Sequence, residues 1–331
     1  MRIIRRYAGL PPEARGAAIA IGNFDGVHRG HQAVIAAAAR LARQAGAPLG
    51  VLTFEPHPRT VLGRAPEPFR LTPFRIKAGA LNDLGVERLY VLRFSGALAA
   101  KPADAFVREV LIQGLAARHL VVGEDFAFGK GRAGTAALLQ TIAVAEGVGV
   151  TLIAPQGAKA GRYSSSEARR LVASGDPRAA AAILGRWFEL EGHIAIGDRR
   201  GRTIGFPTAN LPLEGALHPP AGVYALFAGV PTAAGVAWHQ AVGNVGKRPT
   251  VGGLDERLEV HIFDYSGDLY GRRVCFRFVE RIRPERKFDG LEALKAQIAL
   301  DCREARAILA REQADGPSLG RAATELEQAS T

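Results

Sequence analysis

The chain has 331 residues, of which 47% are hydrophobic and 23% charged, a composition typical of a globular protein long enough for two domains. Its net charge of +11 accompanies a high content of Arg, Ala and Gly, so we attribute the charge to coding bias and expect small phosphorylated ligands rather than nucleic acid. No apolar run reaches the roughly 20 residues of a membrane span. The two cysteines lack metal-ligand spacing, which argues against a disulfide framework or a zinc site. We expect a reduced, cytoplasmic enzyme without a membrane partner.

The first half of the chain alternates short apolar runs with helical patterns. Buried strands are predicted at 17–21, 49–54, 88–94, 119–122 and 148–153. Helices are predicted between them at 31–44, 71–84, 103–114 and 138–146. This alternation predicts an α/β domain, a mostly parallel sheet with helices on both faces. Because ligands bind at the carboxyl ends of such strands, the loops after Ile21, Phe54 and Val122 form the candidate site.

The pattern changes after Gly185. One or two helices are predicted at 164–184, and short apolar runs broken by Gly and Pro then follow at 188–196, 222–228, 239–243, 258–263 and 274–279. Such runs predict a small antiparallel β-barrel, closed by a helix at 291–311. We therefore place two domains at residues 1–184 and 185–312, followed by a disordered tail at 313–331.

A glycine-rich motif, Gly22-Asn-Phe-Asp-Gly-Val-His-Arg-Gly-His31, joins the first predicted strand to the first helix. Backbone N–H groups and the helix dipole favour an anion at such a junction. His28 and His31 are three residues apart, so they can face the same phosphoryl group. The alternatives to ligand binding are structural: the histidines could cap the helix, and Asp25 could be a turn residue. Three glycines let the backbone approach a ligand closely: Gly22, Gly26 and Gly30.

A second motif, Gly201-Arg-Thr-Ile-Gly-Phe-Pro-Thr-Ala-Asn210, forms a restricted turn. The Thr208 hydroxyl and the Asn210 carbonyl oxygen are hard ligands suited to Mg²⁺ that carries a nucleotide phosphate. The segment Leu258-Glu-Val-His-Ile-Phe-Asp264 alternates like a half-buried strand, which places Glu259 on the face opposite to Leu258. A carboxylate there suits the deprotonation or orientation of a hydroxyl for attack on a γ-phosphate.

The first motif, with its His28-Arg-Gly-His31 core, resembles the signature of nucleotidyltransferases. Its longer form resembles the bacterial bifunctional riboflavin kinase/FAD synthetases in particular. Further matches occur in order at Phe54-Glu-Pro-His-Pro58, Gly123-Glu-Asp-Phe-Ala-Phe-Gly129 and Ser164-Ser-Ser-Glu-Ala-Arg169. The resemblance implies adenylyl transfer, in which the FMN phosphate attacks the α-phosphorus of ATP. His28 and His31 would hold the triphosphate, and Arg169 would bind phosphates from the far side.

The same resemblance implies nucleotide-binding roles for Gly22, Asn23, Phe24, Asp25, Gly26, Gly30, Gly123, Asp125, Phe126, Ser164, Ser165 and Ser166. Phe126 and Phe128 also fit core positions, and we favour the core over an adenine platform. One match departs from the family pattern Ser-Ser-Thr-x-Ile-Arg, because Ala168 loses a packing side chain and Glu167 adds a negative charge. This departure bears on the rate of adenylylation.

The second motif is similar to the riboflavin kinase module, together with Gly222-Val-Tyr224, Asn244-Val-Gly246 and Arg248-Pro-Thr250. By that resemblance Thr208 and Asn210 bind Mg²⁺·ATP, and Glu259 is the catalytic base for the ribityl 5′-hydroxyl. The segment 283–288 with the following helix resembles the part that covers the flavin. The loop over the phosphates would be formed by Gly201, Arg202, Gly205 and Pro207.

Together the two motifs imply a transferase that converts riboflavin and ATP to FMN, and then FMN and ATP to FAD and pyrophosphate, with Mg²⁺ as cofactor. In a second enzyme hypothesis only one half is active. In a third, the chain is a flavin- or RNA-responsive regulator that binds without turnover. A cytidylyltransferase of another pathway shares the His28–His31 core, but it does not explain the Pro207–Asn210 motif. The oligomeric state does not follow from the sequence.

Overall fold

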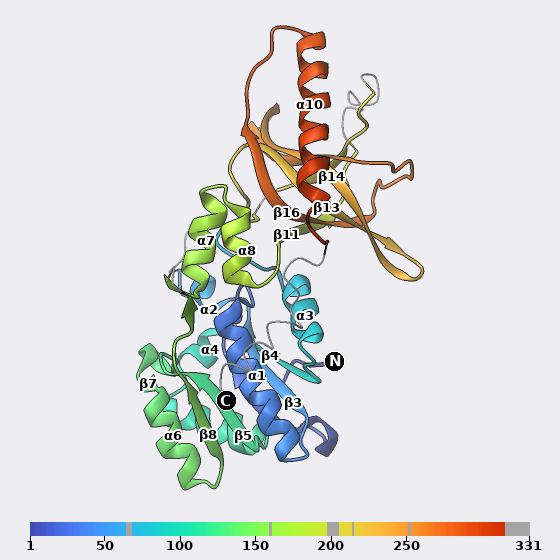
Figure 1. Cartoon of the computed structure of the whole chain (residues 1–331). Helices are drawn as coiled ribbons and strands as arrows, with labels where there is room; N and C mark the ends of the chain where they lie inside the picture. The colour runs from blue at the N-terminus through green and yellow to red at the C-terminus, as the bar shows by residue number, and fades with distance from the viewer. Residues whose placement is uncertain (64–67, 159–160, 197–204, 214, 251–252, 315–331) are drawn as a thin grey trace. The chain divides into compact units, whose positions relative to one another are not determined.

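The computed structural model describes residues 1–63, 68–158, 161–196, 205–213, 215–250 and 253–314, which form two compact units (Figure 1). The chain passes from the first unit to the second between Ser165 and Ser166, and residues 68–71 also belong to the second unit. Of the disordered tail expected at 313–331, residues 313 and 314 are described, and residues 315–331 lie outside the described residues. In the part of the chain that is described, no helix has the length and apolar character to cross a membrane.

The first unit is built on a six-stranded sheet in which all neighbouring strands are parallel, in the order β1-β4-β3-β2-β5-β8. Its strands are β1 (Arg2–Ile4), β2 (Ala18–Ile21), β3 (Leu49–Glu55), β4 (Arg88–Arg93), β5 (His119–Gly123) and β8 (Gly149–Ile153). The predicted parallel α/β fold is confirmed. The edge strand β1 was missed because three residues are too few to show a period.

Helices flank this sheet along its whole length. They are η1 (Pro12–Ala14), α1 (Arg29–Gln44), α2 (Pro58–Val61), α3 (Phe74–Asp83), α4 (Gly96–Ala99), α5 (Ala103–Ala105), the π-helical η2 (Phe106–Gly114), η3 (Lys130–Arg132) and α6 (Ala136–Ala145). Helix α3 begins three residues later than predicted, because the backbone and hydroxyl of Thr72 are bound to Asp25 and Pro73 caps the helix. Two small ribbons complete the unit: β6 (Ala127–Phe128) with β7 (Gly134–Thr135), and β9 (Gly157–Ala158) with β10 (Gly161–Arg162).

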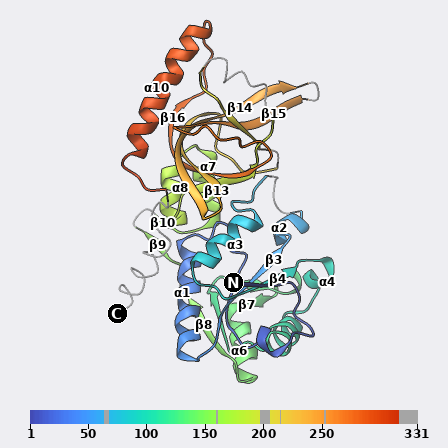
Figure 2. The ribbon, with the colours of Figure 1, turned by 90° about the vertical axis from the view of Figure 1, so that its right-hand side faces the viewer.

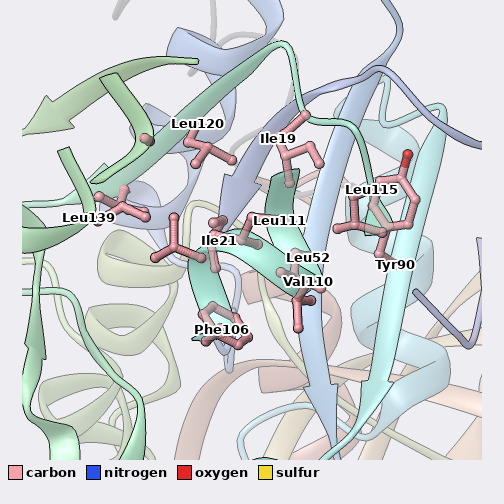
Figure 3. Close-up of a cluster of buried hydrophobic side chains, with 14 of the residues drawn as sticks. Ile19, Ile21, Leu52, Tyr90, Phe106, Val110, Leu111, Leu115, Leu120 and Leu139 are labelled. Atoms are coloured by element: carbon pink, nitrogen blue, oxygen red, sulfur yellow. The ribbon is translucent and has the colours of Figure 1, made fainter. Parts of the chain in front are cut away.

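Alternate residues of β2 point to opposite faces of the sheet, and each face has its own core. Ile19 and Ile21 lie in a cluster with Leu52 of β3 and Phe106 of η2, drawn in Figure 3. Ala18 and Ala20 lie in the other cluster, under α1. Because both faces are buried, the strand reads as a continuous apolar run, which is the signal that identified it.

The strand order reverses next to β2. From β2 the chain continues through β3 and β4 on one side, whereas β5 and β8 lie on the other. Parallel α/β sheets bind ligands outside the carboxyl ends of the strands at such a switch point. Gly22 follows the end of β2, and Gly123 ends the neighbouring β5. The fold therefore brings the loops that begin at Gly22 and Gly123 to the same edge of the sheet.

The second unit contains a curled antiparallel sheet that forms a half-barrel, with strand order β11-β16-β13-β14-β15-β12 (Figure 2). Its strands are β11 (Phe188–His193), β12 (Ala209–Pro212), β13 (Gly222–Thr232), β14 (Gly235–Thr250), β15 (Gly253–Ile262) and β16 (Arg273–Pro284). A single antiparallel bridge between Ala195 and Asn210 links the two edges of the sheet. The predicted barrel and its C-terminal helix α10 (Leu291–Leu309) are confirmed.

Residues of β13 alternate between the two sides of this curled sheet. Tyr224 and Leu226 face the barrel interior, whereas Ala225 and Phe227 face outward. Ala305 and Leu309 of α10 cover the outward-facing cluster. Beyond the helix, the carbonyl of Gln313 accepts a hydrogen bond from Nε1 of Trp187 (3.1 Å), and the carbonyl of Ala314 accepts one from Arg277 (2.9 Å).

Two further helices, α7 (Ser165–Ala173) and α8 (Pro177–Leu184), pack on the barrel. Ala168, Val172, Ala180 and Leu184 are all buried in the cluster that fills the barrel. The sequence places these helices, at 164–184, in the first domain of residues 1–184. Their apolar faces instead contact barrel residues, a long-range match that the period does not reveal. The point at which the chain divides into independently folding domains stays a prediction.

Candidate active sites

The loop that follows β2 has an unusual backbone conformation. Phe24, Gly26 and Val27 have φ values of 50°, 89° and 45°, all in the left-handed region. That region suits glycine, but it strains a branched residue such as Val27. Strained residues of this kind concentrate at functional sites and persist only where surrounding contacts hold them. The loop predicted to bind phosphates is therefore a tightly specified turn.

Asp25 supports this loop from inside. Its Oδ1 accepts hydrogen bonds from the amide and the hydroxyl of Thr72 (both 3.1 Å), and Thr72 Oγ1 accepts one from the amide of Gly26 (2.9 Å). The Ser165 hydroxyl donates to the Asp25 carbonyl (2.9 Å). Asp25 is 2% exposed, so its carboxylate supports the loop from the interior of the protein. Its expected contact with nucleotide stays a prediction.

His28 caps α1, and this fixes the orientation of its ring. Its Nδ1 accepts a hydrogen bond from the amide of His31 (3.3 Å), the third residue of the helix. An Nδ1 that accepts carries no proton, so neutral His28 has its hydrogen on Nε2. The capping alternative for this histidine is thus present, and it places the ring hydrogen on Nε2, a group whose chemistry suits donation to an anion. One ring serves both the helix and the candidate site.

The structure brings the two predicted histidines together. The His28 and His31 rings stack with centroids 3.6 Å apart, and Phe24 meets His31 edge-on at 5.1 Å. A Cβ on Gly30 would lie 3.2 Å from His28 ring atoms and 3.3 Å from the Tyr163 carbonyl. Glycine at this position therefore allows the histidine ring to lie against the helix backbone.

Two residues that the sequence did not single out, Thr53 and Lys77, hold the carbonyl of Asn23. The Thr53 hydroxyl and Lys77 Nζ each donate to it at 3.0 Å, and Lys77 Nζ also contacts Glu55 Oε1 at 3.0 Å. Glu55 lies inside the Phe54–Pro58 match, which was its only signal. Lys77 reads as an ordinary helix lysine in the sequence, but it is completely buried.

The predicted residues near the end of β5 differ in how deeply they are buried. Asp125 is exposed and forms an ion pair with Arg162 (2.6 Å). Phe126 is half-buried against the core and stacks on Phe128, with centroids 5.3 Å apart. A Cβ on Gly123 would lie 3.0 Å from Asp125 Oδ1. Phe126 and Phe128 thus pack at the core, as favoured from the sequence, and the nucleotide contacts of Gly123, Asp125 and Phe126 stay predictions.

The serine motif lies where the chain passes from one unit to the other. Ser164 and Ser165 belong to the first unit and Ser166 to the second. Arg169, in the second unit, donates through Nε to the Phe69 carbonyl (2.6 Å), and its guanidinium carbon lies 5.2 Å from the Phe69 ring centroid. The role of Arg169 beside the histidines stays a prediction.

The two unusual residues of this motif have clear partners. Glu167 binds Arg170 through both carboxylate oxygens, at 3.0 and 2.6 Å. The hydrogen bond from Arg170 lowers the pKa of Glu167, and both side chains are exposed. Ala168 is fully buried beside Val172 in the barrel core. The extra negative charge is therefore matched by Arg170, and the alanine fits a packed position.

The second site is centred on Glu259 of β15. In the sheet Glu259 pairs with Asn210 of β12 on one side and with Asn244 of β14 on the other. Directly paired residues share a face of the sheet, so these three side chains form one row. Leu258 is fully buried whereas Glu259 is half-buried, as the alternating pattern predicted.

The turn before β12 supplies the remaining residues. Gly205 has a φ of 86° and Pro207 is exposed. The carbonyl of Pro207 accepts a hydrogen bond from Nδ1 of His261 (2.9 Å), which is two residues from Glu259 on the same strand. Thr208 lines a pocket of about 60 Å³ together with Pro207, Ile194, Tyr265, Asp268 and Tyr270. His261 was not predicted, because its partner lies 54 residues away. Gly201 and Arg202 lie outside the described residues.

A carboxylate from the segment after β16 reaches the same row. Glu285 Oε1 accepts a hydrogen bond from Nδ2 of Asn244 (3.3 Å). Just before it, Arg283 forms a bidentate pair with the buried Asp301 of α10 (2.9 and 2.7 Å), and Gln297 donates to the same carboxylate (2.7 Å). Helix α10 thus anchors the start of the segment that carries Glu285 to Asn244.

The oxygen donors of this site fit a magnesium ion that arrives with nucleotide. Asn210 Nδ2 is directed at the Thr208 carbonyl (3.4 Å), which turns its Oδ1 the other way. A threonine hydroxyl and an amide oxygen are ligands that Mg²⁺ accepts, and phosphates and water complete its shell. Among the described residues no group of three His, Cys, Asp or Glu could hold a metal alone.

Comparisons with known proteins match both units. The family model for FAD synthetase matches residues 10–167, and that for riboflavin kinase matches residues 184–309. A solved structure described as a macrolide-efflux protein from Streptococcus pneumoniae has a TM-score of 0.81 and 30% identity, over 92% of this chain and 98% of that one.

Curated relatives carry both activities in their names. Bifunctional riboflavin kinase/FMN adenylyltransferases from Escherichia coli K12 and Pseudomonas fluorescens are 39% and 40% identical, over 91% and 94% of this chain and 96% and 98% of theirs. That from Bacillus subtilis is 38% identical, over 89% of this chain and 93% of its own. With two family models in the expected order and relatives matched over nearly their whole length, the chain belongs to the family of bifunctional riboflavin kinase/FMN adenylyltransferases.

Proposed function

We propose that this chain phosphorylates riboflavin with ATP at the Glu259 site and adenylylates the resulting FMN with ATP at the His28 site. Its membership of the bifunctional family supports both reactions. The observation that carries the assignment is that each unit contains its own site: a histidine-capped helix in the first, and a carboxylate flanked by two amides in the second.

In adenylyl transfer a phosphate oxygen of FMN attacks the α-phosphorus of ATP, and the bond to pyrophosphate breaks. No protein nucleophile takes part, so catalysis consists of positioning and stabilisation of negative charge. We assign to His28 Nε2 the donation of a hydrogen bond to the triphosphate. His31 and the amides of the strained loop complete the cradle at the helix N-terminus. Arg169 and the serines of residues 164–166 act on the phosphates as well.

In the kinase reaction the ribityl 5′-hydroxyl attacks the γ-phosphorus of another ATP, and the bond to ADP breaks. We assign to Glu259 the acceptance of the hydroxyl proton, or its orientation toward the phosphate. Thr208 and Asn210 would hold Mg²⁺, which would offset the negative charge of the phosphates when bound. His261 holds the Pro207 carbonyl and so keeps Thr208 in place.

The cysteines and the net charge bear on the compartment and the partners of the enzyme. Cys275 and Cys302 are free thiols, which fits a reducing compartment, and we assign the protein to the cytoplasm. Whatever its origin, the net positive charge would help to attract phosphorylated substrates, and we propose no nucleic-acid partner.

Product analysis with riboflavin, ATP and Mg²⁺ tests the proposal. FMN and then FAD should form in sequence. FMN without FAD, or FAD only from supplied FMN, would show that one half alone is active. Tight flavin binding without either product would identify a regulator instead.

A further inference from the structure

Lys77 of α3 is a buried cation that has no assigned role in either proposed reaction. Its side chain has no exposed surface, and its ammonium contacts Glu55 and the Asn23 carbonyl at 3.0 Å each. Burial of an ammonium is costly unless it is paired and hydrogen-bonded. A buried ion pair can nevertheless often be replaced by apolar residues without loss of stability. Stability alone is therefore a weak reason for a lysine here.

The contact with Asn23 fixes one peptide plane of the phosphate-facing loop. The Asn23 carbonyl accepts from Lys77 Nζ and from the buried Thr53 hydroxyl, so both of its lone pairs are used. The peptide that follows is trans, since the cis bond of the described residues is Glu55–Pro56. In a planar trans peptide the N–H points opposite to the C=O. The amide of Phe24 is therefore directed away from Lys77.

This peptide immediately precedes the strained residues. Phe24, Gly26 and Val27 are all left-handed, a conformation that is strained in residues other than glycine. Two other contacts hold the loop further along: Thr72 binds Asp25, and Gln32 Nε2 donates to the Val27 carbonyl (2.9 Å). Lys77 and Thr53 provide the corresponding support at the start of the loop. From there the chain leads directly to His28.

We propose that Lys77 is a positioning residue for adenylyl transfer: it holds the Asn23 carbonyl, with Thr53, and so keeps the Gly22–His28 loop in its phosphate-binding form. This inference rests on the proposed function of that loop. Lys77 acts through the backbone and touches no substrate. Its pairing with Glu55 allows a charged donor to remain in the buried position without a net charge.

Two variants remove the contact in different ways. Lys77→Met keeps the length of the side chain but removes the donor, and Thr53→Val removes the second donor to the same carbonyl without any change of charge. We expect each to lower kcat for FAD formation from FMN, by roughly 10²-fold for Lys77→Met, the scale for a displacement of about 1 Å. The KM for ATP in this reaction should rise, since the loop would bind the triphosphate less well. FMN formation by the same preparations should stay within about 2-fold, because its site lies in the other unit.

Controls separate positioning from folding and from charge. Lys101→Met changes a lysine of the same unit that pairs with Glu109 on the surface, and it should leave both reactions unchanged. A variant that only lowers the folded fraction would show a reduced kcat with the KM for ATP unchanged, and this result would overturn the proposal. So would recovery of wild-type kinetics in Lys77→Met/Glu55→Gln, because Lys77 would then only balance Glu55. If Lys77→Met fails to fold, Thr53→Val decides, and wild-type kcat and KM in that variant would overturn the proposal.

The same assays distinguish this inference from the function on which it rests. Wild-type protein and His28→Asn are measured in parallel. Absence of FAD in the wild type, or full FAD formation by His28→Asn, would remove the proposed function itself. If both behave as proposed while the Lys77 and Thr53 variants keep wild-type kinetics, only the positioning role fails.

Discussion

His28 links secondary structure to chemistry through its two ring nitrogens. Nδ1 caps α1, and this leaves the ring proton on Nε2, the atom we assign to the triphosphate. A capping residue is worth about 1 kcal/mol to a helix. Substitution of His28 therefore changes both the helix start and the site, and a test of its chemistry has to keep the cap.

We expect His28→Ala to abolish FAD formation from FMN while FMN formation from riboflavin stays nearly intact, since the residues proposed for the kinase reaction lie in the second unit. His28→Asn should give the same result with less loss of stability, because asparagine is a strong N-cap but has no imidazole. Chromatographic separation of FMN and FAD measures both reactions in one sample. Equal loss of both activities in a folded variant would contradict the assignment of two separate sites.

Glu259→Gln should have the opposite effect. If Glu259 accepts or orients the ribityl hydroxyl, riboflavin phosphorylation should fall by roughly 10²-fold or more, the usual scale for a general base. FAD formation from supplied FMN should persist, and Mg²⁺·ATP should bind as before. Initial rates of FMN formation measure the effect.

Asp264→Asn is the matched control for Glu259. Asp264 is the next carboxylate along the chain, but Arg306 of α10 binds it through both oxygens (2.9 and 3.0 Å) and its side chain is largely exposed. This variant should retain its kinase rate. Kinase activity near wild type in Glu259→Gln, with a loss in Asp264→Asn, would exchange the two roles.

The two thiols should react slowly in the folded protein. Burial raises the pKa of Cys302 to about 11, and burial, with Glu189 nearby, raises that of Cys275 well above its usual range. Both therefore stay protonated at about pH 8, whereas an unfolded thiol, with a pKa of about 8.5, is partly ionised. Because the folded state then holds more protons, this contribution to stability is complete below the unfolded pKa and is lost as pH rises through the folded pKa. Alkylation followed by mass spectrometry should show slow labelling until denaturant is added, and rapid labelling of the native protein would be inconsistent with these pKa values.

At the scale of elements, α7 and α8 pack with the barrel although they precede most of the segment that the kinase family model matches. The riboflavin kinase family model begins at residue 184, the last residue of α8. Their buried residues nevertheless lie in the barrel core, with Leu184 and Val172 almost fully enclosed. Full burial of such a side chain stabilises by about 1.5–3 kcal/mol.

This packing predicts different behaviour for two fragments. Residues 166–314 should fold and phosphorylate riboflavin, whereas residues 185–314, cut at the boundary expected from the sequence, should be less stable because barrel residues lose their cover. Thermal unfolding and kinase assays of both fragments, beside the full chain, measure the difference. Equal stability and activity of the two fragments would show that α7 and α8 contribute little to the barrel.

At the scale of the whole molecule, the sequence predicted what periodicity and short motifs encode. The run at 17–21 and the change of pattern after Gly185 identified the parallel sheet and the barrel. What it did not show are contacts between distant residues, such as Lys77 with Asn23 and His261 with Pro207, which are both 54 positions apart. Such side chains have no local signature, because each becomes a support only once the fold brings its partner near.

If each unit carries its own site, as we propose, the two reactions should be separable between molecules. A mixture of His28→Asn and Glu259→Gln should convert riboflavin to FAD, because FMN released by the first variant is adenylylated by the second. Each variant alone should stop early: the first at FMN, and the second largely at riboflavin. No FAD in the mixture, with each variant active in its own half-reaction, would show that FMN does not leave the chain that makes it.

Tryptophan fluorescence of this protein should report on only one of its two units. Both tryptophans of the chain, Trp187 and Trp238, belong to the second unit. The indole of Trp187 is bound to the Gln313 carbonyl, and the guanidinium carbon of Arg277 lies 3.9 Å from the Trp238 ring centroid. Their emission therefore reports on the barrel and the residues after α10, and the α/β unit contributes none of it. Far-ultraviolet circular dichroism registers both units, so a denaturation curve recorded by both signals resolves the unfolding of each half without cutting the chain.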